Sequence, residues 1–514
     1  KEAQRIYREA RRQGLRSVLL AQEGPCLFSH RIANVAPAEA IDVEFHYFHT
    51  LPHRDGWYEF VYPMVQRQSA VERDDEGTPT VELPARRSGR NVHVRVAIDA
   101  GLPIEAIESP SHKVTVQHPY RSRGAWARVA LATARYVANR DFVVRYRVAG
   151  DALRSTMLFH RSKLGGFFTL MLHPPADLEA LPRQPVELIF ALDASGSMKG
   201  APVRKATAAV RQALRRLSPR DTFQILRFAG EVEPFETQAV TATAANVQRA
   251  EAWLDEVEAR GGTDLYEGVR TALALPEPGE RLRFLVVLTD GCARRLGDVL
   301  STVARKAGGT RVFSIGLGEA PDRYLLERMA QLGRGAVAYV GQGDDPAAVT
   351  DRFVTRATRP AMTHLSIDWG ALRVADVYPE RVPDVFHGRP VVLVGRFRSA
   401  RATTVRIRGL VAGEPREIRL DVDPADGGPA HTGIAPLWAK AHIAALAREL
   451  AEGSSPGRPQ RIVRLARHFN LVTPLTDMLV IDTVRGTRTS RSPAVVIPDA
   501  APQSLDLSPT LFRP

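Results

Sequence analysis

Nearly continuous apolar runs alternate with amphipathic stretches in the middle of this chain, and this alternation constrains the fold more than any other feature. The run VELIFAL (186–192) has the character of a strand that is buried on both faces. The same pattern predicts further strands at 222–230, 283–291 and 310–318, and helices near 203–214, 244–259, 265–275, 296–306 and 346–358. Recurring strand and helix units predict a Rossmann-like, doubly wound α/β sheet over residues 183–358.

The flanking regions have a different pattern. Residues 2–13 have helical spacing, and apolar residues then alternate with a period of two, as in 92–98, up to about residue 173. This alternation predicts an N-terminal β-sandwich over 1–175, which the proline-rich segment 173–185 separates from the α/β domain.

Beyond residue 360 the sequence predicts a C-terminal β-rich region that contains two helices. The strands occupy its first part, the helices lie around 436–451 and 458–469, and a last strand covers 477–482, so the region spans 360–482. The segment 484–514 is rich in Ser, Thr, Pro and Arg, and we expect it to be disordered. A multidomain α/β plus β protein agrees with a length of 514 residues.

Composition excludes some classes of function. No apolar run is long enough for a transmembrane segment. The net charge of +13 is spread along the chain without aromatic-interleaved basic motifs, which favours a solvated basic surface over specific nucleic-acid binding. Cys26 and Cys292 fall in different predicted domains, so they indicate neither a disulfide framework nor a zinc-ligand pair.

Oxygen-bearing side chains follow the ends of the predicted α/β strands. The motif D-x-S-x-S comes directly after VELIFAL, a threonine lies in the loop before a predicted helix, and an aspartate ends the strand RFLVVLT; the residues are Asp193, Ser195, Ser197, Thr263 and Asp290. Taken singly, each could be a helix N-cap. Because the carboxyl ends of such strands meet at one edge, the set predicts a site for Mg²⁺, or for Mn²⁺ or Ca²⁺, which bind hard oxygen donors.

These three loops resemble the metal-ion-dependent adhesion site (MIDAS) of the von Willebrand factor type A (VWA) family, over roughly 183–358. The resemblance implies that Ser195, Ser197 and Thr263 bind the cation directly or nearly so. It implies that Asp193 and Asp290 act largely through water, and that a partner fills the remaining coordination position.

The flanks are similar to a larger family. Residues 33–64 look like the VIT domain that precedes the VWA domain in inter-alpha-trypsin inhibitor heavy chains and their bacterial relatives. Residues 462–482 resemble the closing segment of that family, although Thr476-Asp477-Met478 replaces a serine-aromatic pair. In VIT-like domains strands precede the first helix, so we expect the chain to be truncated at its N-terminus.

The resemblance implies a divalent-cation-dependent protein-binding or adhesion module. We expect the protein ligand to supply an acidic side chain to the metal, with Lys199, Arg294 and Arg295 steering it. Walker and G-x-S-x-G motifs are absent from the sequence, so we expect no enzyme. The alternatives are a structural scaffold with a vestigial metal site and a basic surface for acidic polymers. The residues leave the compartment open; the resemblance alone favours an extracellular, cell-surface or periplasmic one.

Overall fold

The computed structural model describes most of the chain as two units. One unit comprises Lys1–Ala149 and Pro429–Pro514, and the other comprises Gly150–Gly428. The described residues are 2–24, 27–35, 51–54, 56–62, 64, 92–118, 124–133, 141–148, 150, 152–175, 181–276, 279–290, 295–318, 321–341, 345–388, 390–398, 401–426, 431–451, 457–473 and 475–485.

The first unit combines three antiparallel sheets with helices. Its elements are α1 (Glu2–Arg12), β1 (Leu15–Gly24), β2 (Leu27–Ala33), β3 (His53–Arg54), β4 (Trp57–Tyr62), β5 (Arg95–Asp99), β6 (Ile104–Glu108), β7 (Val114–Gln117), β8 (Trp126–Leu131), β9 (Phe142–Val148), α8 (Ile434–Ala451), α9 (Arg458–His468) and β25 (Met478–Arg485). The sheets have the strand orders β2-β1-β25, β3-β4-β9-β6 and β5-β8-β7. The last two share one core, to which Ile98 and Val129 contribute from one sheet and Phe142 and Val144 from the other.

Several sequence predictions fall in this unit. The first helix ends at Arg12, and Gly14 follows with φ of 77°, a conformation that glycine adopts without a steric penalty. Strand β25 covers the predicted last strand but pairs with β1, so the two ends of the described chain share a sheet. Of the VIT-like segment 33–64, residues 36–50, 55 and 63 lie outside the described residues, as does the predicted disordered tail from residue 486 onward.

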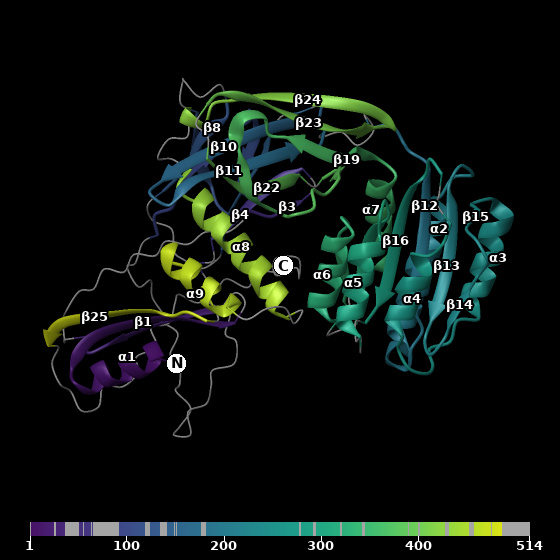
Figure 1. Ribbon diagram of the computed structural model, residues 1–514, viewed down its shortest axis with the longest axis horizontal. Coiled ribbons are helices and arrows are strands. Elements are labelled where there is room, and N and C mark those ends of the chain that lie inside the picture. Colours follow the sequence, from purple (N-terminus) through teal and green to yellow (C-terminus); the bar gives the residue numbers. More distant parts are fainter. Residues whose placement is uncertain are drawn as a thin grey trace. The chain divides into compact units, whose positions relative to one another are not determined.

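The second unit contains the predicted doubly wound sheet. Its α/β elements are β12 (Val186–Asp193), η1 (Gly196–Met198), α2 (Ala201–Arg216), β13 (Thr222–Phe228), β14 (Val232–Pro234), β15 (Val240–Thr241), α3 (Ala244–Asp255), α4 (Leu265–Ala272), β16 (Leu282–Thr289), α5 (Leu296–Lys306), β17 (Arg311–Leu317), α6 (Arg323–Leu332), β18 (Val337–Val340) and α7 (Pro346–Ala357). The strand order is β14-β13-β12-β16-β17-β18, with β15 also on β13 (Figure 1). The four pairings among β13, β12, β16, β17 and β18 are parallel, which confirms the α/β prediction.

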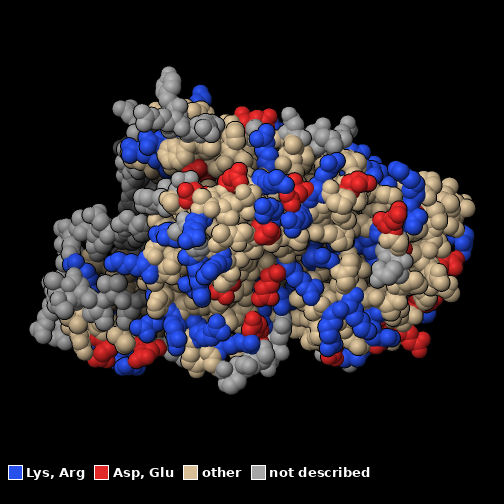
Figure 2. All heavy atoms as spheres, turned by 45° about the horizontal axis from the view of Figure 1, so that its top comes forward, with Lys and Arg blue, Asp and Glu red and all other residues tan. Residues whose placement is uncertain are grey.

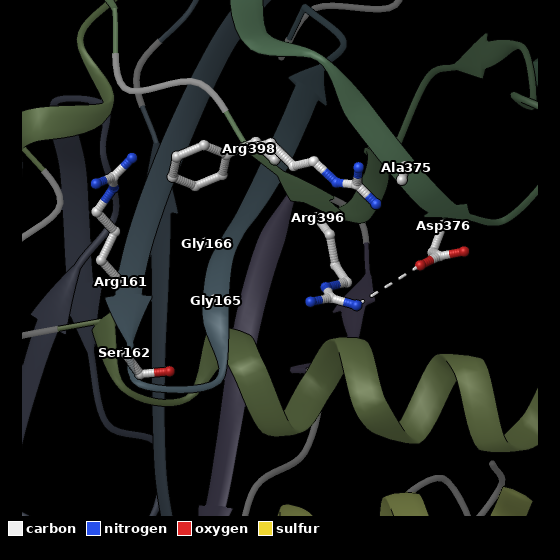
Figure 3. Close-up of a pocket in the computed structure, with 9 residues that line it drawn as sticks. Arg161, Ser162, Gly165, Gly166, Ala375, Asp376, Arg396 and Arg398 are labelled. Carbon is white, nitrogen blue, oxygen red and sulfur yellow. Dashed lines mark ion pairs between the residues drawn. The ribbon is translucent and has the colours of Figure 1, made fainter.

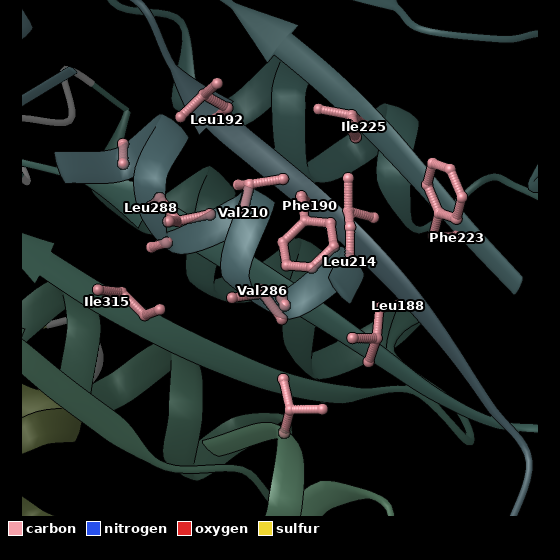
Figure 4. Close-up of a cluster of buried hydrophobic side chains, with 14 of the residues drawn as sticks. Leu188, Phe190, Leu192, Val210, Leu214, Phe223, Ile225, Val286, Leu288 and Ile315 are labelled. Carbon is pink, nitrogen blue, oxygen red and sulfur yellow. The ribbon is translucent and has the colours of Figure 1, made fainter. Parts of the chain in front are cut away.

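Helices cover both faces of this sheet, which explains its nearly continuous apolar strands. On one face α2, α3 and α7 cover the sheet. There Val210 and Leu214 of α2 join the same buried cluster as Leu188 and Phe190 of β12 (Figure 4). On the other face α4, α5 and α6 pack on the alternate residues of the same strands, for example Ile189. Burying both faces fixes the position of each strand end and therefore of the loops that follow.

The remaining strands of the second unit come from both sides of the α/β domain in sequence. They are β10 (Arg154–Ser162), β11 (Gly165–His173), β19 (Pro360–Asp368), β20 (Val374–Tyr378), β21 (Val385–Phe386), β22 (Val391–Phe397), β23 (Thr403–Val411) and β24 (Glu414–Val422), with η2 (Gly370–Leu372) and η3 (Pro424–Asp426). Two four-stranded sheets, β10-β11-β22-β20 and β21-β19-β23-β24, enclose one apolar core. The predicted boundary at residue 175 therefore separates β10 and β11 from β22, their partner in this sheet.

Ion pairs with buried carboxylates lie at the amino ends of the parallel strands. Arg183 pairs with Asp221 before β12 and β13, and Arg283 Nε lies 2.5 Å from Glu187 Oε1. The amino edge is thus held by charge pairs, whereas the opposite edge carries the candidate site.

None of the helices in the described ranges is both long and apolar enough to cross a bilayer.

Candidate functional site

The candidate site lies at the carboxyl edge of the doubly wound sheet, where the strand order reverses. Strand β12 has β13 on one side and β16 on the other, so the connections leave β12 and β16 in opposite directions along the sheet. Open α/β sheets bind ligands at such a switch point. Asp193 is the last residue of β12, and Asp290 follows directly after Thr289, the last residue of β16.

Asp193 is fully buried and held by two donors. Its Oδ1 accepts from the backbone N–H of Ser195 at 2.9 Å, and its Oδ2 accepts from the hydroxyl of Thr289 at 2.5 Å. Burial raises the pKa of Asp193, the hydrogen bonds from Thr289 and Ser195 oppose that rise, and the nearby charge of Asp290 adds to it. The fold therefore orients a carboxylate at a place where a negative charge is costly without a compensating cation.

The two serines of the D-x-S-x-S motif present their hydroxyls together. The Oγ atoms of Ser195 and Ser197 are 3.1 Å apart, and the 3₁₀ turn η1 carries Ser197 directly after the strand. Ser195 is buried, whereas Ser197 is exposed. The pair thus places one oxygen inside the loop and one at its solvent side.

The loop that carries Thr263 is tied to the serine loop by backbone hydrogen bonds. Gly196 donates to the carbonyl of Gly261 at 3.0 Å, and Arg260 donates to the carbonyl of Ala194 at 2.8 Å. Thr263 follows within this loop and is partly buried. The structure therefore brings the loop of Thr263 beside Ser195 and Ser197, as the sequence predicts.

Asp290 has an unsatisfied oxygen. Its Oδ1 is buried and has no hydrogen-bond partner among the described residues. Buried polar atoms are rarely left without a partner, and a lone carboxylate oxygen is among the costly cases. Asp290 lies at the same carboxyl edge of the sheet as Asp193, and the charge of Asp290 raises the pKa of Asp193.

Arg295 links two of the loops in a way that the sequence analysis missed. Its Nη2 lies 2.9 Å and 2.8 Å from the two carboxylate oxygens of Asp264, and its guanidinium stacks 4.2 Å from the ring centroid of Tyr266. Asp264 also caps α4 by accepting from the N–H of Glu267. Arg295 therefore connects the loop after Asp290 to the loop of Thr263. The sequence analysis expects this arginine to steer the protein ligand, whereas in the structure it is bonded to Asp264.

The other two predicted steering charges have different outcomes. Lys199 is exposed directly after η1, while Arg294 lies outside the described residues together with Cys292. The signal for Thr289 was present in the sequence, because a hydroxyl residue ends the strand just before the aspartate. The signal for the Arg295 contact was absent, because its partner is 31 positions away.

The chemistry of the donor set fits a hard divalent cation. The described residues contain no group of three or more His, Cys, Asp or Glu side chains placed to hold a metal. The candidate site instead joins two carboxylates with hydroxyls, and Mg²⁺ binds such oxygen donors while keeping water ligands. The unpartnered oxygen of Asp290 is the local observation that agrees with this chemistry.

Comparison with known proteins supports the identification of the α/β domain. Residues 186–339 match the family model described as von Willebrand factor type A domain. A von Willebrand factor A domain-containing protein of Dictyostelium discoideum is 28% identical, over 61% of this chain and 16% of that protein. Inter-alpha-trypsin inhibitor heavy chain H2 of Sus scrofa is 21% identical, over 97% of this chain and 54% of that protein.

The chain thus spans about half or less of the length of these curated relatives. Among solved structures, the von Willebrand factor type A protein from Catenulispora acidiphila is 14% identical with a TM-score of 0.43, over 62% of this chain and 87% of that chain. The family match and the doubly wound sheet identify residues 186–339 as a von Willebrand factor type A domain, in a chain related to the inter-alpha-trypsin inhibitor heavy chains and other proteins that carry this domain.

Proposed function

We propose that the VWA domain is a divalent-cation-dependent protein-binding module. Mg²⁺ is the favoured cation, with Mn²⁺ or Ca²⁺ as alternatives. The hydroxyls of Ser195, Ser197 and Thr263 supply neutral oxygen donors, and two aspartates supply negative charge. On this proposal the site binds a partner and catalyses no reaction.

The buried, unpartnered Oδ1 of Asp290 is the observation that carries the proposal. A fully buried carboxylate, Asp193, stands at the end of the neighbouring strand, and the nearby charge of Asp290 raises the pKa of Asp193. Helix capping does not account for this arrangement, because neither carboxylate caps a helix. A bound cation would supply the missing partner and offset the repulsion.

The same donor set suggests the chemistry of the partner. Two carboxylates balance the charge of a divalent cation only when both are ionised, and the hydroxyls add no charge. The exposed side of the site, where Ser197 lies, is open to solvent and can admit a further oxygen ligand. A carboxylate from an aspartate or glutamate of a partner protein is the ligand that suits a hard cation there.

Binding to an immobilised peptide array tests this proposal. Each peptide containing Asp or Glu is paired with its Asn or Gln counterpart, and binding is measured in Mg²⁺, in chelator and at high salt. We expect acid-dependent binding that chelator abolishes and that Thr263→Val weakens. A matched control, Thr271→Val in α4, changes the same atoms away from the strand ends and should leave binding unchanged.

Binding that survives chelator and disappears in salt would contradict the proposal. That outcome would favour the alternative of a basic surface for acidic polymers, because exposed charge pairs are screened by salt and need no cation. Figure 2 shows lysine and arginine side chains spread over the visible face, with acidic side chains between them.

A further inference from the structure

A second candidate binding site lies in the β-sandwich of the second unit, on the sheet β10-β11-β22-β20. A pocket of about 360 Å³ opens at the β10–β11 turn, and its lining includes Arg161, Arg396 and Arg398. This volume falls in the range of small-molecule sites. Figure 3 shows Arg161 on one side of the glycines of the turn and the other two arginines on the opposite side.

Aromatic rings support two of these arginines. The guanidinium of Arg161 lies 5.3 Å from the ring centroid of Phe397, and that of Arg396 lies 5.7 Å from the ring centroid of Phe167. Such contacts hold the side chain but leave the N–H groups at the guanidinium edge available as donors. Two of the three lining arginines are therefore positioned against aromatic rings.

Positive charge exceeds negative charge in the lining. Asp376 is the only carboxylate of the lining, with its Oδ2 4.0 Å from Nη1 of Arg396. Within the described part of the chain, the side chains of Arg161 and Arg398 have no hydrogen-bond or ion-pair partner. Because arginine stays protonated, the pocket carries two uncompensated positive charges.

The backbone of the turn keeps the pocket open. Gly165 has φ of 123°, and a Cβ atom there would come 3.1 Å from Nη2 of Arg396. A Cβ atom at Gly166 would come 2.8 Å from the ring of Phe397, the ring that supports Arg161. Side chains at either position would displace the groups that line the pocket, so two glycines are required for its present shape.

We propose that this pocket binds a phosphate or sulfate group carried by a small ligand. Guanidinium groups donate paired hydrogen bonds to tetrahedral oxyanions, and an anion would neutralise the two uncompensated charges. The site is separate from the carboxyl edge of the VWA sheet and needs no divalent cation. It adds a binding activity that the proposed adhesion function does not include.

Calorimetric titration of the full chain in chelator with inorganic phosphate, and separately with inorganic sulfate, tests this proposal. We expect saturable binding in the millimolar range or tighter, and binding about tenfold weaker or more in the double variant Arg161→Gln/Arg398→Gln, because charge-assisted hydrogen bonds are lost. The control Arg220→Gln/Arg416→Gln removes the same charge from exposed positions outside the pocket and should bind as the wild type does.

The two anions also identify the source of the group. Tighter binding of phosphate assigns a phosphate ester, and tighter binding of sulfate assigns a sulfate ester. The single variant Arg398→Gln, at an exposed position, gives the same test if the double variant does not fold. Absence of saturable binding by the wild type, or equal binding by wild type and Arg398→Gln, would overturn the proposal.

Discussion

The hydroxyl of Thr289 is expected to set the orientation of Asp193, and Thr289→Val removes that hydroxyl while keeping the shape of the side chain. Both residues are fully buried, and the Oγ1 to Oδ2 distance is 2.5 Å. Without this donor a buried carboxylate oxygen loses a charge-assisted hydrogen bond, which costs about 1.5–3 kcal/mol of unfolding free energy. The backbone N–H of Ser195 remains, so the domain should stay folded.

Native-state hydrogen exchange in chelator, followed at β12 and β16, measures this loss where it occurs. The control Thr302→Val changes a buried threonine of α5 whose side chain makes no hydrogen bond in the described ranges, and it should cost less. We also expect Thr289→Val to weaken Mg²⁺ binding by roughly 10–100-fold, as happens when groups that orient metal ligands are removed. Equal stability of Thr289→Val and wild type would refute the role assigned to this hydroxyl.

Other perturbations probe the loops and the opposite edge. Arg295→Gln removes the contacts of Nη2 with both carboxylate oxygens of Asp264, so calorimetry should show weaker Mg²⁺ binding with α4 still folded. Unchanged affinity would show that the Mg²⁺ site does not need this link between the loops. Gly268→Ala places a Cβ atom 2.7 Å from the Phe228 ring and should cost about 1–3 kcal/mol in denaturant unfolding, and a neutral result would mean that α4 moves freely. For Asp221, burial opposes ionisation, but hydrogen bonds from Arg183 and the backbone hold its pKa below the ordinary 3.8. The ionised carboxylate of Asp221 should therefore stabilise the fold above pH 3.8, and this stabilisation should be lost as the pH falls through the lower pKa of the folded protein. The difference in unfolding free energy between wild type and Asp221→Asn should then shrink in acid, and a difference that stays constant with pH would contradict this.

Local periodicity predicted most of the α/β domain, because each of these helices and strands is specified by residues that are close together in the sequence. Helix α5 has the predicted bounds 296–306, since Val299, Leu300 and Val303 form one buried face. Helix α6 was not predicted, although Asp322 caps it and its apolar residues have helical spacing. This helix has only ten residues and lies between β17 and β18, and its helical period was not recognised in the sequence.

Pairing between distant strands was beyond the reach of the sequence patterns. The alternation in 154–173 indicates strands, but it does not indicate that β11 pairs with β22, more than two hundred residues away. Register between such strands depends on which apolar faces meet in the folded core. The same reason explains the candidate site: the strand-end residues were predicted, whereas the contact between Arg295 and Asp264 depends on how two loops meet.

Calorimetric titration with Mg²⁺ tests the central claim most directly, using the full chain, Asp193→Asn and the control Glu280→Gln. Both variants remove one negative charge, but Glu280 is exposed before the amino end of β16, at the opposite edge of the sheet. We predict saturable binding by wild type and Glu280→Gln, and its loss in Asp193→Asn, because the cation then lacks a charged, oriented carboxylate. Equal Mg²⁺ affinity in all three proteins would contradict a cation site at Asp193.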